Sequence, residues 1–224
     1  MQFKRVALFS GHYGSGKTNI AVNYALRLRS FGNEVVVADL DTVNPYFRTK
    51  DSSDVLEKEG IRIISSQFAN TNLDIPSLPA EAYAVVQDKT RSAVIDVGGD
   101  DAGAVALGRY VPYILEENDY DMFFVINKCR PLTGTAEETV QVLREIECAA
   151  KLPFTAIINN SNLGHLTTPE DVLSSQKYAD EVSKLTGLDV RYTTVKQDIA
   201  SALYGKIENL FELKLHVYQT WSTI

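Results

Sequence analysis

The stretch GHYGSGKT, residues 11–18, fits the pattern G-x-x-x-x-G-K-[ST] and lies between an apolar run at 6–9 and an amphipathic stretch that begins at Lys17. Glycines at this spacing let the backbone curl so that successive N–H groups point inward at an anion. The helix that follows adds its positive amino-terminal end. The pattern predicts a phosphate-binding loop, and its expected ligand-binding residues are Gly11, Gly14, Ser15, Gly16, Lys17, Thr18 and Asn19.

Outward from this loop, short β-rich runs alternate with helical stretches, which is typical of repeated β-α units. Several runs are rich in Val and Ile without alternation, as expected for strands covered on both faces. We expect an α/β fold with one doubly wound, mainly parallel sheet, helices on both faces, and a single domain over 1–224. The expected strands are 5–9, 34–39, 61–64, 93–97, 122–127, 155–159 and 189–193, and the expected helices are 17–31, 77–88, 135–150, 169–185 and 199–221.

Composition excludes several classes of protein. The net charge is −7 and no Lys-rich or Arg-rich block occurs, which argues against a nucleic-acid-binding surface. No apolar run approaches the ~18 residues that span a bilayer, and no secretory leader is evident, so a cytoplasmic protein is expected. Cys129 and Cys148 lie far apart, which favours neither a disulfide framework nor a zinc site.

The carboxyl-terminal stretch 206–224 carries an apolar stripe, but its only cations are Lys206 and Lys214, opposed by Glu208 and Glu212. Because a membrane-surface helix needs a cationic polar face, we expect this stripe to pack on the core or on a dimer partner. Membrane binding is not expected.

Two acidic segments follow apolar strands. Asp39 ends the second expected strand and Asp41 follows it, and the two share one side of an extended backbone because side chains repeat every second residue. Asp96 ends a later strand and is followed by Gly98 and Gly99. Acids at these strand ends suit a magnesium shell or the positioning of a water, and the glycines allow close approach to a terminal phosphate.

The order GHYGSGKT, then DLDT at 39–42, then VIDVGG at 94–99, resembles the MinD/ParA/CobQ group of P-loop ATPases in the SIMIBI class. The resemblance implies an ATP site at the carboxyl ends of the strands and often a nucleotide-dependent homodimer. By this resemblance Lys17 binds the β- and γ-phosphates, Thr18 ligates Mg²⁺, and Asp41 positions the attacking water. Asp39 and Asp96 are then metal-shell residues.

The resemblance also implies an adenine-contacting Asn at the end of the strand near 155–159. Asn160 is preferred over Asn159 for this role. The segment from Tyr192 to Asp198 resembles the loop after the last strand that closes over the base.

One departure concerns the dimer. Relatives in this group carry KGGxGKT, in which the first Lys reaches the partner's nucleotide, whereas this chain has His12 at that position. A neutral imidazole is a weaker phosphate partner, so activation by a sandwich dimer is in doubt.

A guanine-nucleotide site is the competing interpretation, because residues 96–99 also satisfy the pattern DxxG. The guanine-binding motif of GTPases resembles NKxD, whereas residues 127–130 of this chain are NKCR. Arg130 cannot accept a hydrogen bond, so ATP is favoured, and 122–127 is interpreted as a core strand followed by an exposed loop with Lys128 and Arg130.

The leading hypothesis is therefore a Mg²⁺-dependent ATPase that acts as a nucleotide switch, slow without an unidentified protein partner. One alternative is an ATP-dependent synthetase or amidase-like enzyme of cofactor biosynthesis, resembling dethiobiotin synthetase or CobQ, with a small-molecule acceptor near Arg48, Asp100, Asp101 and Arg109. A second alternative is a nucleotide-binding interaction protein that does not hydrolyse ATP.

Overall fold

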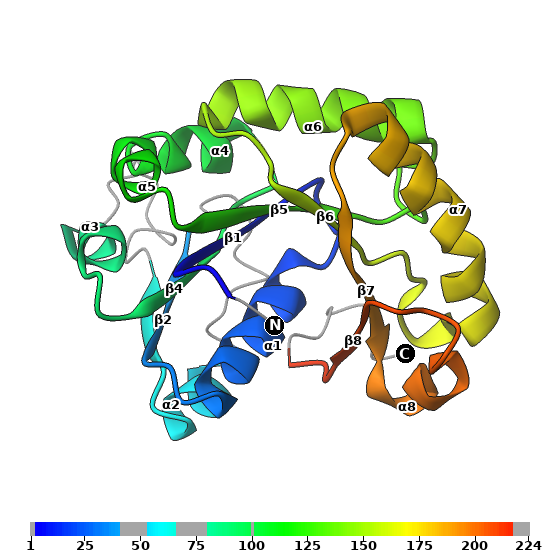
Figure 1. The fold of residues 1–224 in the computed structure, drawn as a ribbon, viewed down its shortest axis with the longest axis horizontal. Coiled ribbons are helices and arrows are strands. Elements are labelled where there is room, and N and C mark those ends of the chain that lie inside the picture. Colours follow the sequence, from blue (N-terminus) through cyan, green and yellow to red (C-terminus); the bar gives the residue numbers. More distant parts are fainter. Residues whose placement is uncertain (1–2, 41–52, 66–79, 100, 217–224) are drawn as a thin grey trace, which may run out of the picture.

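Eight parallel strands form one sheet in a computed structural model that describes residues 3–40, 53–65, 80–99 and 101–216. The strand order is β3-β2-β4-β1-β5-β6-β7-β8, and every neighbouring pair runs parallel (Figure 1). The strands are β1 (Val6–Ser10), β2 (Val35–Asp39), β3 (Arg62–Ser65), β4 (Ser92–Asp96), β5 (Tyr120–Ile126), β6 (Ala156–Asn159), β7 (Val190–Lys196) and β8 (Leu210–Leu213). The predicted doubly wound α/β fold is confirmed.

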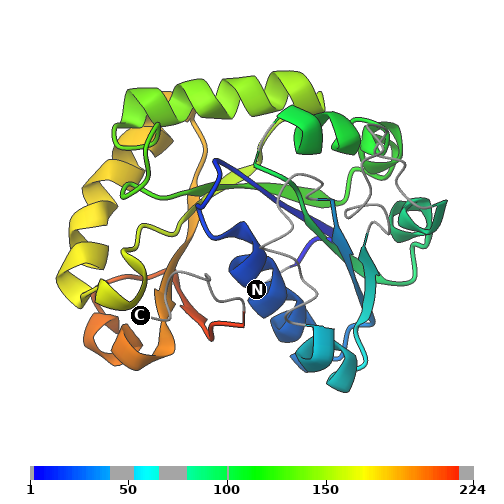
Figure 2. The same cartoon turned by 180° about the vertical axis from the view of Figure 1, so that it is seen from behind.

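Helices cover both faces of the sheet. Figures 1 and 2 show α1 and α2 on one side and α4, α5 and α6 on the other. The helices are α1 (Lys17–Ser30), α2 (Ser53–Lys58), α3 (Ala80–Gln87), α4 (Asp101–Leu107), α5 (Val111–Glu117), α6 (Ala136–Ala150), α7 (Pro169–Thr186) and α8 (Gln197–Ala200), with short 3₁₀ turns η2 (Gly164–Leu166) and η3 (Ser201–Leu203).

The central strand β1 shows why the strands read as continuous apolar runs. Val6 and Leu8 pack into the cluster beneath α4, α5 and α6, whereas Ala7 and Phe9 pack into the cluster beneath α1. Successive side chains point to opposite faces, and both faces are covered by helices. Every position of β1 is therefore buried, and alternation disappears.

The carboxyl-terminal segment corrects a prediction. The expected helix over 199–221 is wrong: the chain forms α8 and η3, and then β8. Phe211 and Leu213 are buried in the core while Glu212 between them is exposed, which is the period of a strand, and Gly205 lies at φ 74°. The expected packing of this stripe on the core is confirmed for Phe211 and Leu213.

Two further expectations change near the site. The strand β7 runs to Lys196, so most of the segment expected as a base-closing loop is a strand, and β8 follows it.

The short helices α2, α4 and α5 have six or seven residues each and were not predicted, because two turns carry too little periodicity. Both cysteines are free and exposed.

A membrane-spanning helix would need a long apolar run. None of the helices formed by 3–40, 53–65, 80–99 and 101–216 is both long and apolar enough to cross a bilayer.

Candidate functional site

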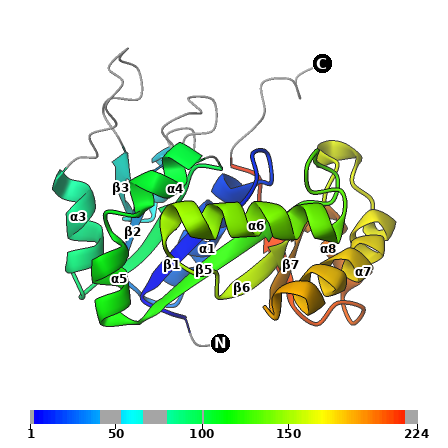
Figure 3. The same cartoon turned by 90° about the horizontal axis from the view of Figure 1, so that it is seen from above.

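The predicted phosphate-binding loop connects β1 to α1 at the carboxyl edge of the sheet. Because β4 and β5 flank β1, the ends of these strands lie beside the loop. Figure 3 shows the loop after β1 at the same edge as the connections that follow β5 and β6, with the amino end of the chain at the opposite edge. Ligands of open parallel sheets bind in crevices at this edge.

Two glycines show how tightly the loop is wrapped. A Cβ on Gly11 would lie 2.3 Å from the carbonyl oxygen of Val125, and a Cβ on Gly16 would lie 2.3 Å from Nδ2 of Asn160. Both have positive φ angles, 150° and 91°, which side-chain-bearing residues rarely adopt. Only glycine fits these positions, so the pattern reflects geometry of this chain and is no incidental turn.

The N-cap residue of α1 provides no side-chain hydrogen bond to the start of the helix. Gly16 is the N-cap and offers no side chain, whereas α6 and α7 begin with complete capping boxes built on Thr135 and Thr168. A helix begins with four N–H groups that lack intrahelical partners. At α6 and α7 side chains bind some of these groups, and at α1 the N–H groups and the helix dipole favour an anion.

Lys17 arches back over the loop. Its Nζ donates to the carbonyl oxygens of Gly11 at 3.1 Å and His12 at 3.3 Å, and the residue is 6% exposed. A Cβ on Gly99 would lie 2.8 Å from this Nζ and 2.9 Å from the backbone of Gly11 and of Tyr13. The segment after β4 therefore lies against the phosphate-binding loop.

The three predicted metal residues lie on neighbouring elements. Thr18 Oγ1 donates to Asp96 Oδ2 at 2.6 Å, and Asp39 is the register partner of Asp96 across β2 and β4. All three residues are buried. Hydroxyl and carboxylate oxygens are ligands that Mg²⁺ accepts, and Mg²⁺ usually binds one or two carboxylates together with substrate phosphates. This donor set fits Mg²⁺ in the company of a nucleotide.

Within the described segments no group of three or more His, Cys, Asp or Glu residues could hold a metal ion.

Several predicted residues lie outside the described part of the chain. These are Asp41, the expected water-positioning acid, and Arg48 and Asp100 of the alternative acceptor pocket. Asp101 is the first residue of α4, and Arg109 is exposed after the same helix.

The two candidate asparagines separate clearly. Asn159 is fully buried; its Nδ2 donates to Ser175 Oγ at 2.9 Å, and its Oδ1 accepts from Ser161 N at 3.2 Å and Ser161 Oγ at 2.7 Å. Asn160 Nδ2 instead donates to the carbonyl oxygen of Ser15 in the phosphate-binding loop, at 2.5 Å. Asn160 faces the site, and Asn159 joins β6 to α7.

Thr194 of β7, which lies in the segment expected to close over the base, extends this contact. Its Oγ1 donates to Asn160 Oδ1 at 2.5 Å, so a buried chain of hydrogen bonds runs from β7 through Asn160 to Ser15. One N–H of Asn160 and one of its acceptor positions remain beyond these two bonds.

Asn19 takes part in a different contact. Its Oδ1 accepts from the backbone N–H of His216 at 3.0 Å, and Asn23, one turn later, bonds both backbone groups of Lys214. These asparagines hold the segment after β8 against α1.

Arg130 corrects an expectation. Lys128 is exposed, as expected, but Arg130 is half-buried and its Nε donates to the carbonyl oxygen of Gly14 at 2.9 Å. The two residues are 116 positions apart, so no local pattern in the sequence announces the contact.

The surroundings of His12 disfavour its charged form. Burial lowers the pKa of its imidazole below the ordinary value, and the nearby positive charges of Lys17 and Arg130 act in the same direction. The expected neutral imidazole at this position therefore agrees with its surroundings.

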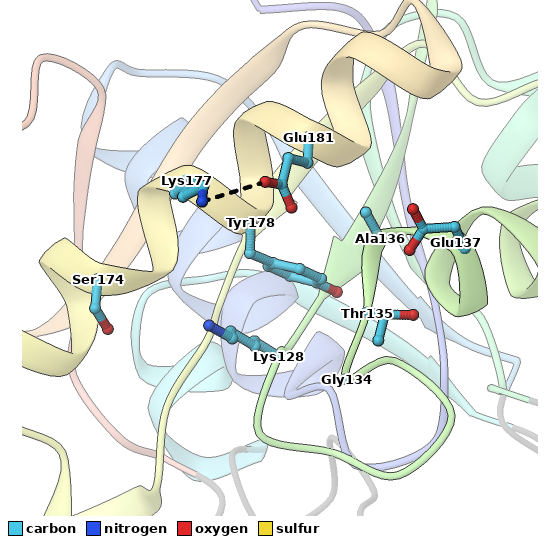
Figure 4. Close-up of a pocket in the computed structure, with 9 residues that line it drawn as sticks. All are labelled: Lys128, Gly134, Thr135, Ala136, Glu137, Ser174, Lys177, Tyr178 and Glu181. Atoms are coloured by element: carbon cyan, nitrogen blue, oxygen red, sulfur yellow. Dashed lines mark ion pairs between the residues drawn. The ribbon is translucent and has the colours of Figure 1, made fainter.

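A separate cavity of about 330 Å³ lies between the start of α6 and the middle of α7. Figure 4 shows it bordered by Lys128, Tyr178 and the Lys177–Glu181 ion pair, whose Nζ–Oε1 distance is 3.9 Å. Burial raises the pKa of Tyr178 to about 12, and the Tyr178 hydroxyl lies 2.7 Å from Thr139 Oγ1. The loop from β5 to α6 thus has one cation, Lys128, at this cavity and another, Arg130, at the phosphate-binding loop.

Comparisons with known proteins support the fold. No family model matches the chain, and no curated protein matches it. Among solved structures, cell division protein FtsY from Thermotoga maritima matches with a TM-score of 0.60 at 19% identity, over 87% of this chain and 62% of that one.

Two further solved structures carry GDP. The signal recognition particle receptor FtsY from Elizabethkingia anophelis in complex with GDP matches with a TM-score of 0.57 at 20% identity, over 87% of this chain and 58% of its own. The 54 kDa protein of the signal recognition particle from Aeropyrum pernix, also with GDP, gives 0.54 at 18%, over 86% and 41%. This chain thus spans less than two thirds of each, and at such identities the likeness shows the α/β fold alone.

Proposed function

We propose that this chain binds Mg²⁺–ATP at the loop between β1 and α1 and hydrolyses it slowly as a nucleotide switch of the MinD/ParA kind. The observation that carries the proposal is convergence: the amino end of α1, the Lys17 ammonium and the Thr18–Asp96 pair all lie at one loop. Such a set binds a phosphate chain and a hard cation together.

Binding follows from groups already in place. The N–H groups of the loop and of the first turn of α1 donate hydrogen bonds to phosphate oxygens, and Lys17 exchanges its carbonyl partners for the β- and γ-phosphates. Thr18, Asp96 and Asp39 would hold Mg²⁺, which neutralises phosphate charge when it is bound. These residues are preorganised in a buried setting, where electrostatic stabilisation is strongest.

The base is proposed to be adenine. The loops that follow β5 (127–135) and β6 (160–168) contain no Asp or Glu, so neither offers the carboxylate that accepts from guanine N1–H and N2–H₂. An Asn amide has both a donor and an acceptor, which suits the amino group and ring nitrogens of adenine. The GDP in two structural neighbours makes GTP the competing ligand.

The switch would use the segment after β4. Gly99 lies against Lys17 and the backbone of the phosphate-binding loop, so a γ-phosphate that enters beside Lys17 must displace or reorganise this segment. Asp41 is proposed to orient the attacking water. Hydrolysis would then release the segment, and a partner protein would read the difference.

Titration calorimetry with ATP, ADP and GTP, each with and without Mg²⁺, tests binding. We expect ATP to bind the wild type and not to bind Lys17→Ala. We expect GTP to bind the wild type more weakly than ATP does. Lys4→Ala is the matched control, because Lys4 forms an exposed ion pair with Asp119 at the opposite edge. Absence of adenine-nucleotide binding by the wild type would refute the proposal.

Phosphate release tests the enzymatic part. An Asp41→Ala variant should retain ATP affinity and lose turnover, and unchanged turnover would remove Asp41 from its assigned role.

Sizing with Mg²⁺–ATP and with ADP tests the homodimer. ADP release that is stimulated by a carboxylate acceptor would favour a synthetase, and tight ATP binding without any phosphate release would favour a non-hydrolysing interaction protein.

A further inference from the structure

The loop from β5 to α6 brings a guanidinium to the phosphate-binding loop. Arg130 Nε donates to the carbonyl oxygen of Gly14 at 2.9 Å. Its Nε, Cδ and Cζ would lie 3.4 to 3.7 Å from a Cβ placed on Gly14, so the guanidinium packs directly on this glycine. These are ordinary van der Waals distances.

The backbone holds Arg130 in place. The carbonyl oxygen of Asn127 accepts from Arg130 N at 3.1 Å and from Thr133 Oγ1 at 2.8 Å, and Asn127 Oδ1 accepts from Cys129 N at 3.0 Å and Asn162 N at 3.2 Å. Within the same loop Leu132 adopts φ 63°. A left-handed leucine costs free energy, and such strain persists where the surroundings over-determine the backbone.

Most donors of Arg130 remain available. A guanidinium has five N–H donors, and one of them is used on Gly14. In the described part of the chain, Nη1 and Nη2 have no hydrogen bond, and no carboxylate forms an ion pair with Arg130. A half-buried cation in this state favours an anion, and planar guanidinium groups bind phosphates with two parallel hydrogen bonds.

The geometry points to Arg130 as a second phosphate-binding cation of the nucleotide site, supplied by the same chain from the loop after β5. Nε stays on Gly14, and Nη1 and Nη2 bind oxygens of the phosphate chain that Lys17 also binds. This inference rests on the proposed function, because the phosphates are those of the bound nucleotide.

Arg130→Gln is the decisive variant. The amide nitrogen of Gln occupies the same place along the side chain as Nε of Arg, so the contact with Gly14 can persist while Nη1, Nη2 and the charge are lost. Lys128→Ala is the matched control, since it removes a cation from the same loop at the cavity beside α7. Arg130→Lys keeps the charge without the planar fork.

Calorimetry with Mg²⁺–ATP and with Mg²⁺–tripolyphosphate measures the effect. We expect Arg130→Gln to weaken both ligands by the same factor of about 10 to 100, as for a lost charge-assisted hydrogen bond. Arg130→Lys should recover part of this loss, and Lys128→Ala should stay within about twofold of the wild type, as for surface charges. Equal affinities of Arg130→Gln and wild type would overturn the inference and leave the proposed function intact.

Two other outcomes also decide it. A loss for ATP without a loss for tripolyphosphate would place Arg130 at the base and overturn the phosphate assignment. Failure of the wild type to bind either ligand would overturn the proposed function and this inference together.

Discussion

Two arginines at opposite ends of the central strands have opposite surroundings. Arg5, just before β1, has a 9% exposed side chain that pairs with Glu117 and donates to the carbonyl oxygens of Val85, Val86, Asp88 and Arg91. Arg130, just after β5, makes one side-chain hydrogen bond in the described structure, to Gly14. Arg5 is saturated by protein groups, and Arg130 keeps donors for a ligand.

The helix ends differ in the same way. Capping boxes close the starts of α6 and α7, while α1 starts at an αL glycine without a side-chain cap. The difference teaches that Arg5 and the starts of α6 and α7 are satisfied by other groups of the protein. At the carboxyl edge beside β1, the groups of the phosphate-binding loop are arranged for an anion.

The largest effect is expected at the scaffold arginine. Arg5→Ala leaves the Glu117 carboxylate and four carbonyl oxygens without their partner, so the free energy of unfolding should fall by about 3–5 kcal/mol. Urea denaturation measures it. Lys4→Ala, which breaks an exposed ion pair, should cost less than about 1 kcal/mol; similar losses in both variants would erase the contrast.

The neighbouring asparagines offer a sharper test. Asn159→Ala removes three hydrogen bonds of a buried amide, so the free energy of unfolding should fall by about 2–3 kcal/mol with ATP affinity nearly unchanged. Asn160→Ala should instead lower ATP affinity about tenfold, as for one lost hydrogen bond to the ligand. Calorimetry and urea denaturation on both variants decide, and exchanged phenotypes would reverse the assignment of these residues.

Gly99→Ala tests the contact between the switch segment and the phosphate-binding loop. The added Cβ would lie 2.8–2.9 Å from Lys17 Nζ and from backbone atoms of Gly11 and Tyr13, so the free energy of unfolding should fall by about 1–2 kcal/mol. Gly134→Ala is the control, since its Cβ would meet only Glu138 Oε2 at an ordinary 3.6 Å. Wild-type stability of Gly99→Ala would show that the segment does not pack there.

The smallest effect is a pH dependence at His12. Because the pKa of His12 is lowered in the folded protein, the unfolded chain binds its proton first as the pH falls below about 6.5. The free energy of unfolding should therefore decrease from that pH down to the folded pKa and stay level above it. His12→Gln should flatten this slope in urea denaturation at pH 8 and pH 5.5, and an unaltered slope would contradict the shift.

Periodicity and motif carried the prediction a long way. The expected strand 93–97 is β4 at 92–96, and the expected helix 135–150 is α6 at 136–150. Both were predictable because the core residues of β4 are buried along the strand and those of α6 form one buried stripe. The prediction of a helix over 199–221 was wrong because the helical spacing of its apolar residues was given more weight than Gly205 and the alternation of Phe211, Glu212 and Leu213. Local pattern is ambiguous where a short strand can also be drawn as a helix stripe.

The amino-acid sequence by itself determined the phosphate-binding loop, the acid at the end of β4 and the alternation of strands and helices, since these depend on backbone preferences and neighbours in the chain. Only the tertiary structure decided that Arg130 packs on Gly14, that Asn160 and not Asn159 faces the loop, and that Thr194 supports Asn160. These contacts join residues 116, 145 and 34 positions apart. Their partners are chosen by strand order and register, which no local pattern specifies.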